Sequence, residues 1–277
     1  MKKVIVFVLF GTEGRYCGNM AYNLIANSSI YPDFHLRFYV HKNSMETKGF
    51  KLLKTVADKI PTVELETIDT DYQGTMLTTM RMKPLWEEEV EFLFCRDLDS
   101  IINSLERMSV EYFMKSGKGI HGIRSYVLHT VPFLAGLCGF KRSVIIDKIK
   151  KIAPTFEDYI KWGMEKVDYC KKGWIWGCDQ ALLRDFFSSL GLYNKALDCP
   201  QFTAPLTIAG YNPTMAPMSR YEKIKIVNCD MKVLEYSNSI SKGFTGSPLL
   251  ANTEQVYHLM EISNSPVNDA VKEFYNV

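Results

Sequence analysis

Phe92-Leu93-Phe94-Cys95-Arg96-Asp97-Leu98-Asp99-Ser100 is a hydrophobic run that passes directly into two carboxylates. The apolar part, Val90–Cys95, is typical of a parallel strand buried on both faces. Ligands of open α/β sheets bind beyond the carboxyl ends of such strands. The segment therefore predicts a central strand with a polar site at its end.

Segments with strand and helix patterns alternate around this run. Strands are expected at Val4–Phe10, Leu36–Val40 and Val63–Ile68, with further ones at Ile120–Arg124, Phe133–Gly139 and Lys223–Val227. Helices are expected at Met20–Asn27, Phe50–Lys59, Leu77–Trp86, Ile101–Lys115, Ser143–Ile152, Phe156–Cys170 and Asp179–Leu190. This alternation predicts an α/β fold with a mainly parallel, twisted sheet flanked by helices. We expect one domain over residues 1–277, with an irregular C-terminal segment at 201–277.

Composition excludes several classes of protein. The 277 residues include 33 Lys and Arg and 31 Asp and Glu, so a strongly basic nucleic-acid binder is excluded. No segment approaches the roughly 20 apolar residues of a membrane span, and Met1-Lys2-Lys3 followed by Val4–Phe10 favours a first strand over a signal peptide. The seven cysteines form no CxxC pair, which favours free thiols in a reducing compartment, and we expect a cytoplasmic protein.

Asp97 and Asp99 are candidate metal ligands. Two carboxylates two residues apart lie on the same side of an extended chain. Oxygen ligands suit Mg²⁺ or Mn²⁺, which usually take phosphate oxygens as further ligands. The alternative is a turn at the end of a strand with solvated carboxylates.

Two further segments carry candidate site residues. Asp179, in Gly177-Cys178-Asp179-Gln180, stands where a helix would begin, so it is either an N-cap or a general base. Gly136 and Gly139 allow a close backbone approach to a substrate, or else mark a tight turn. Arg124 could hold an anion, and His121 and His129 are expected to be structural histidines with hydrogen-bond partners. Trp174 and Trp176 are either a platform for a sugar ring or core aromatics.

Together, five blocks resemble a known enzyme family: Arg96–Ser100, Ser116–Lys118, His121–Arg124, Pro132–Gly139 and Gly177–Gln180. They are similar to a family of DxD-containing glycosyltransferases of the GT-A fold, found in bacteria and in large DNA viruses of algae and amoebae. The resemblance covers roughly residues 1–190. The chain departs from the family pattern at Ile101, Ser125-Tyr126 and Ala135, which bears on sugar and acceptor specificity.

The resemblance implies a Rossmann-like nucleotide-binding domain, with a nucleotide-binding half at 1–100 and a donor and acceptor half at 101–200. It implies Mn²⁺ or Mg²⁺ held by Asp97 and Asp99, and Asp179 as the catalytic base. A third metal ligand, often a late histidine in such enzymes, could only be His258. The implied nucleotide-sugar contacts are Phe10, Gly11, Thr12, Arg81, Arg96, Asp97, Leu98, Asp99, Gly136, Gly139 and Gln180.

The function that this implies is metal-dependent transfer of a sugar from a nucleotide diphosphate sugar to a glycan hydroxyl. A UDP-sugar is expected, with UDP-xylose among the candidates, and the acceptor would be an oligosaccharide or glycoprotein. In a virus, the site of action would be the host cytoplasm. Inverting transfer with Asp179 as base is expected, with retaining transfer as the alternative. Two other classes stay open: a phosphohydrolase of the haloacid dehalogenase type and an inactive sugar-nucleotide-binding module.

Overall fold

The computed structural model describes residues 1–12, 16, 19–70, 72, 74–100, 102, 104–123, 134–172, 177–192, 202–203, 226–227, 233–234 and 253–276. Within these ranges, none of the helices has the length and apolar character needed to cross a membrane.

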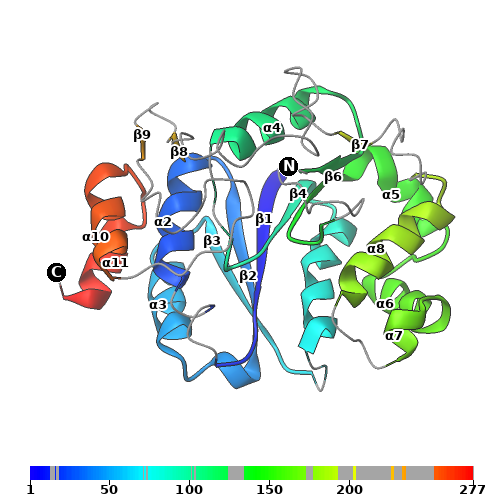
Figure 1. Ribbon diagram of the computed structural model, residues 1–277, viewed down its shortest axis with the longest axis horizontal. Helices are drawn as coiled ribbons and strands as arrows, with labels where there is room; N and C mark the ends of the chain where they lie inside the picture. The colour runs from blue at the N-terminus through cyan, green and yellow to red at the C-terminus, as the bar shows by residue number, and fades with distance from the viewer. Residues whose placement is uncertain are drawn as a thin grey trace, which may run out of the picture.

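A seven-stranded sheet forms the centre of the molecule (Figure 1). Its order is β3-β2-β1-β4-β6-β5-β7. The pairs among β1, β2, β3 and β4 are parallel, β6 is antiparallel to β4 and β5, and β5 and β7 are parallel. The strands are β1 (Lys2–Leu9), β2 (His35–His41), β3 (Val63–Ile68), β4 (Val90–Arg96), β5 (Ile120–Gly122), β6 (Leu137–Lys141) and β7 (Phe202–Thr203); β8 (Ile226–Val227) and β9 (Val233–Leu234) form a separate pair.

Helices cover both faces of the sheet, as the alternation along the sequence predicts (Figure 1). Side chains alternate along β1, so Ile5, Phe7 and Leu9 enter one core and Val4, Val6 and Val8 the other. The first core is closed by α2 (Met20–Ile30), α3 (Lys48–Ala57), α4 (Ser104–Lys115), α10 (Thr253–Ile262) and α11 (Asn268–Tyr275). The second is closed by the 3₁₀ helix η2 (Gly74–Trp86), α5 (Arg142–Lys150), α6 (Phe156–Lys166), α7 (Asp168–Lys171) and α8 (Cys178–Ser189).

Three predicted elements differ from those observed. Residues 77–86 belong to η2, a 3₁₀ helix rather than an α-helix. The helix expected at Phe156–Cys170 is divided into α6 and α7, because the buried Val167 is extended, with φ −103° and ψ 118°. The strand expected at Phe133–Gly139 is β6, which starts at Leu137, while Phe133 lies outside the described residues.

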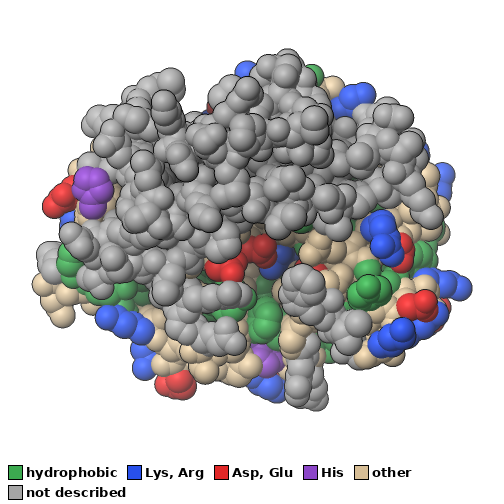
Figure 2. Space-filling model, viewed as in Figure 1, with side chains coloured by type: hydrophobic (Ala, Val, Ile, Leu, Met, Phe, Trp, Pro, Cys, Tyr) green, Lys and Arg blue, Asp and Glu red, His purple; other side chains and the backbone are tan. Residues whose placement is uncertain are grey.

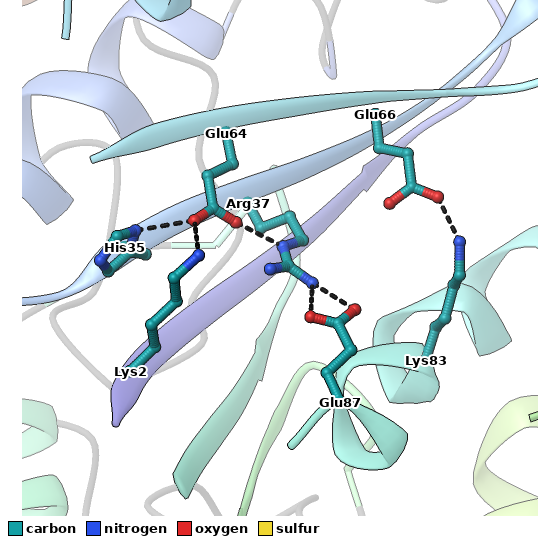
Figure 3. Close-up of polar contacts among 7 residues, drawn as sticks. All are labelled: Lys2, His35, Arg37, Glu64, Glu66, Lys83 and Glu87. Carbon is teal, nitrogen blue, oxygen red and sulfur yellow. Dashed lines mark hydrogen bonds and ion pairs between the residues drawn. The ribbon is translucent and has the colours of Figure 1, made fainter. Parts of the chain in front are cut away.

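Charged side chains replace apolar ones where β2 and β3 face η2 (Figure 3). The buried Arg37 donates from Nε to Glu64 Oε2 at 2.6 Å and from Nη1 to both oxygens of Glu87 at 2.6 Å. Lys2 Nζ lies 2.9 Å from Glu64 Oε1, and His35 Nδ1 lies 2.7 Å from the same oxygen. Every carboxylate in this network therefore has a cationic or hydrogen-bonding partner.

We expect Arg37→Met to lower the free energy of unfolding by about 1–3 kcal/mol, because it leaves the partly buried Glu87 without its cation and removes one of the partners of Glu64. Burial alone would raise the pKa of Glu64, but hydrogen bonds from Lys2 and Arg37 hold that pKa below its ordinary 4.5. This contribution is present above the ordinary pKa and is lost as pH falls through the lowered one. Urea unfolding at neutral and increasingly acidic pH measures it. Lys54→Met, at the exposed Lys54–Asp58 pair, is the control and should change little.

Candidate functional site

A cleft of about 350 Å³ opens beyond the carboxyl ends of β1 and β4, where the sequence predicts a site. Acidic and basic side chains lie together in the middle of the face shown in Figure 2. The cleft is lined by Val8, Phe10, Tyr16, Thr75, Thr78, Arg81, Asp97, Leu98, Asp99, Ser100, Leu134, Ala135, Gly136, Leu137, Gly177, Asp179 and Gln180. The two predicted metal ligands and the predicted base therefore share one cleft.

Arg81 is the buried cation of this cleft. Its Nη2 lies 2.6 Å from Asp97 Oδ1, and only 8 % of its side chain is exposed, against 40 % for Asp97. Burial would lower the pKa of Arg81, but the charges of Asp97 and Asp179 outweigh it and raise that pKa. The cleft thus holds a permanent positive charge among its carboxylates.

The spacing of η2 explains why Arg81 reaches the cleft. Residues three apart lie above one another in a 3₁₀ helix, so Thr75, Thr78 and Arg81 share one side, and all three line the cleft. The two threonines were not predicted as site residues, and Thr75 lies before the helix expected at Leu77–Trp86. The repeat Thr-x-x-Thr-x-x-Arg is the signal that could have identified them.

Asp179 is the second residue of α8 and not its N-cap. The preceding Gly177 takes the cap position with a left-handed φ of 82°. The Asp179 carboxylate accepts hydrogen bonds from Thr78 Oγ1 at 3.0 Å and from the Gln180 backbone N–H at 2.9 Å. Burial, and after it the charge of Asp97, raises the pKa of Asp179 above its ordinary value despite Arg81 and Thr78. This carboxylate is therefore a stronger base than a solvated aspartate.

Gly136 allows Asp97 to adopt its position. The register of β4 and β6 pairs Arg96 with Leu137, so the next residues, Asp97 and Gly136, come together. A Cβ on Gly136 would lie 1.9 Å from Asp97 Oδ2. The prediction of a close backbone approach thus applies to Gly136, although the group that approaches in this structure is the carboxylate.

We expect Gly136→Ala to displace the Asp97 carboxylate, break its pair with Arg81 and destabilise the protein by about 1–3 kcal/mol. Urea unfolding measures the change. The control is the same substitution in an Asp97→Ala background, where the clash is absent and the cost should largely disappear. Equal costs in both backgrounds would contradict this role of Gly136.

Other predicted contacts lie away from the cleft lining. Arg96 is buried behind it, where Nε donates to Glu106 Oε1 at 2.6 Å and Nη1 to the backbone oxygens of Cys95 and Cys138 at 2.7 and 3.1 Å. Of the two arginines that the resemblance implies as donor contacts, Arg81 pairs with Asp97, whereas Arg96 pairs with Glu106 and does not line the cleft. The Gly139 position faces Phe94, since a Cβ there would lie 2.6 Å from Cδ1 of the ring.

The loop after β1 contributes Phe10 to the cleft, stacked on Tyr16 with ring centroids 6.5 Å apart. Gly11 and Thr12 follow, but neither lines the cleft. The Gly11 N–H donates to Asn43 Oδ1 at 3.0 Å, and Ser44 Oγ donates to the Gly11 carbonyl at 2.7 Å. Asn43 and Ser44 belong to the 3₁₀ helix η1 (Lys42–Ser44) and hold this loop; sequence reasoning did not identify them.

The two described histidines from the sequence analysis do not enter the cleft. His121 is buried, with Nε2 2.6 Å from Ser109 Oγ, and burial, followed by the charge of Arg96, keeps its pKa well below the ordinary value. This agrees with a structural hydrogen bond. His258 lies on α10 with 57 % of its side chain exposed, 3.9 Å from Glu261, and is not in the cleft lining. Several other predicted positions lie outside the described residues: Ile101, Arg124, Ser125, Tyr126, His129, Pro132, Trp174 and Trp176.

The donor set of the cleft fits a hard divalent cation. Asp97 and Asp99 supply carboxylate oxygens at its wall. Among the described residues, no group of three or more His, Cys, Asp or Glu side chains is placed to hold a metal ion. A cation bound here would need water or substrate oxygens to complete its coordination, as is usual for Mg²⁺.

No family model matches the chain, and no curated protein matches it. Among solved structures, the WbbM bifunctional glycosyltransferase has a TM-score of 0.48 at 13 % identity, over 99 % of this chain and 51 % of that one. Staphylococcus aureus TarS 1–349 in complex with UDP-GlcNAc has a TM-score of 0.41 at 13 % identity, over 55 % and 48 %. A protein assigned as a glucose-1-phosphate thymidylyltransferase from Bacillus anthracis has 0.42 at 11 %, over 69 % and 84 %. The matched part spans about half the length of the TarS 1–349 structures, and TM-scores below 0.5 do not establish a shared fold.

Proposed function

We propose that this chain is a metal-dependent glycosyltransferase of the GT-A fold. It would move a sugar from a nucleotide diphosphate sugar, with a UDP-sugar such as UDP-xylose as the first candidate, to a hydroxyl of an oligosaccharide or glycoprotein. One observation carries this proposal. Asp97 and Asp99 from the end of β4 and Asp179 from the start of α8 line a single cleft around a buried arginine, at the carboxyl end of the sheet.

In this proposal, Asp97 and Asp99 hold Mn²⁺ or Mg²⁺ together with the donor diphosphate. The cation would stabilise the negative charge that develops on the leaving diphosphate. Phe10, Leu98, Gly136 and Gln180 line the same cleft and would contact the donor. Arg81 would supply a second positive charge beside the phosphates.

Asp179 would act as the general base of an inverting transfer. Its carboxylate takes the proton of the acceptor hydroxyl, whose oxygen forms a bond to the anomeric carbon. The bond from that carbon to the phosphate oxygen breaks, and the nucleoside diphosphate leaves with the electron pair. Burial favours this role, because it raises the pKa of Asp179.

Retaining transfer is the alternative within this class. There, Asp179 would stabilise a positively charged sugar and take no proton. Both of its oxygens already accept hydrogen bonds, which suits a fixed electrostatic role. The anomeric configuration of the product, read by NMR, distinguishes the two mechanisms.

The phosphohydrolase alternative is disfavoured by the lining of the cleft. Its nucleophile would be Asp97, whose carboxylate is paired with Arg81. Such an enzyme is expected to use a lysine as well, and the described residues that line the cleft include none.

Thermal unfolding with a panel of nucleoside diphosphates and nucleotide sugars, with and without Mn²⁺, tests the proposal. A ligand at 100 times its dissociation constant adds roughly 2.7 kcal/mol of stability, so binding raises Tm by several degrees. We expect a rise with one nucleotide class that requires the metal, followed by sugar transfer or slow donor hydrolysis. Release of phosphate from simple esters, without any response to nucleotides, would overturn the proposal in favour of a phosphohydrolase. Binding without turnover would indicate an inactive module.

A further inference from the structure

Arg81 forms an ion pair with Asp97, the first of the two proposed metal ligands. Its guanidinium contacts Asp97 Oδ1 at 2.6 Å, and Asp97 Oδ2 lies against Gly136. The carboxylate is thus held on both sides, by a cation at one oxygen and by backbone at the other. A metal ion that binds Asp97 therefore has to compete with Arg81 for its carboxylate.

The guanidinium of Arg81 still has capacity for another ligand. The Arg81 residue is 6 % exposed, and its Nε has no hydrogen-bond partner among the described residues. A buried N–H without a partner is costly, so a ligand that accepts from it gains free energy on binding. Arginine presents its donors in a planar fork that matches the oxygens of a phosphate group.

The charge of the cleft also disfavours a diphosphate that arrives alone. Asp97, Asp99 and Asp179 face one arginine, which leaves a formal charge of −2 when all three are ionised. A divalent cation balances that charge, whereas a diphosphate that arrives without the cation is repelled. By charge alone, diphosphate is therefore a poor ligand for the free cleft, and it becomes a good one together with the cation.

We propose that Arg81 is a positioning residue that occupies Asp97 in the free protein and is transferred to the donor phosphates when the metal and the nucleotide enter as a pair. The inference rests on the proposed function and adds an order of binding to it. In the free protein, Mn²⁺ binds weakly because Arg81 is paired with Asp97, even though carboxylates are present. Removing the arginine should therefore strengthen the binding of the metal alone.

The test is a titration of Mn²⁺ into nucleotide-free protein, with free Mn²⁺ measured by electron paramagnetic resonance. We expect Arg81→Gln to bind Mn²⁺ more tightly than the wild type, on the order of tenfold or more, because it removes a unit positive charge from direct contact with a ligand. Adding UDP should strengthen Mn²⁺ binding strongly in the wild type and much less in Arg81→Gln. Lys83→Gln is the matched control, since Lys83 lies on the same helix but pairs with Glu66 outside the cleft, and it should behave as the wild type.

Circular dichroism and urea unfolding establish whether Arg81→Gln is folded. If it is not, the titration is repeated with Arg81→Lys, which keeps the charge on a smaller donor. For Arg81→Lys we expect an intermediate gain in Mn²⁺ affinity. Equal or weaker Mn²⁺ binding by the folded variants, or no binding by any of them, would overturn the inference. The titration contains no sugar nucleotide, so a gain in Mn²⁺ affinity without any nucleotide-sugar response would uphold the Arg81–Asp97 competition and reject the glycosyltransferase proposal.

Discussion

Asp179→Asn should lower the rate of sugar transfer by about 1,000-fold, the middle of the range for general-base catalysis, and leave nucleotide binding intact. The amide keeps the shape of the side chain but cannot take a proton from the acceptor hydroxyl. Transfer is measured with the donor and acceptor identified by the thermal panel, and nucleotide binding by the shift in Tm. Unchanged turnover in this variant would reject Asp179 as the base.

The pH dependence of transfer separates a base from a merely structural carboxylate. Because burial raises the pKa of Asp179, the rate should fall at acidic pH, as the carboxylate becomes protonated, and this limb should lie above the ordinary pKa of 3.8. The hydroxyl of Thr78 lowers that pKa by hydrogen bonding, so Thr78→Val should move the acidic limb to higher pH. A limb that Thr78→Val leaves in place would indicate that another group titrates.

Asp99→Asn should abolish the metal-dependent stabilisation by nucleotide and lower the transfer rate by about 1,000-fold. Loss of a cation that stabilises a leaving diphosphate removes several kcal/mol of transition-state stabilisation, which corresponds to a rate change of this order. Asp99 lines the cleft, and Arg81 forms its close ion pair with Asp97, so we expect Asp99 to be the more direct metal ligand.

Tm measured with nucleotide and with increasing Mn²⁺ tests this expectation. Asp147→Asn, on the exposed side of α5, is the control for loss of one negative charge and should keep the full response. A response to Mn²⁺ that survives in Asp99→Asn would place the metal elsewhere and remove the main support for the Asp-x-Asp site.

Local patterns predicted most of the architecture. The continuous apolar residues of Val4–Phe10 and Val90–Cys95 indicate strands buried on both faces, and β1 and β4 are such strands at the centre of the sheet. The pattern was less informative at η2, where Met76, Leu77, Met80 and Met82 are buried in a 3₁₀ helix. Over a single turn an α-helix and a 3₁₀ helix place similar residues on one side, so a few apolar positions do not distinguish the two, and they diverge over longer stretches.

For the candidate site, the residues alone identified which carboxylates stand at the ends of strands and helices. Asp97, Asp99 and Asp179 were named from the apolar runs and turns beside them, because these signals are local. Which arginine pairs with Asp97 does not follow from the residues next to it in the chain. Arg96 is next to Asp97 in the chain, but alternation along β4 directs its side chain to the opposite face, where it pairs with Glu106.

Arg81 and Gly136 reach Asp97 from positions 16 residues before it and 39 residues after it, through the packing of η2 against β4 and the antiparallel pairing of β6. Sequence patterns report the period and burial of one segment at a time, and from them the strands, most helices and the carboxylates of the site were predicted. Contacts between segments depend on register, on side-chain direction and on helix type, so the cation and the glycine that hold Asp97 were set by the assembled fold.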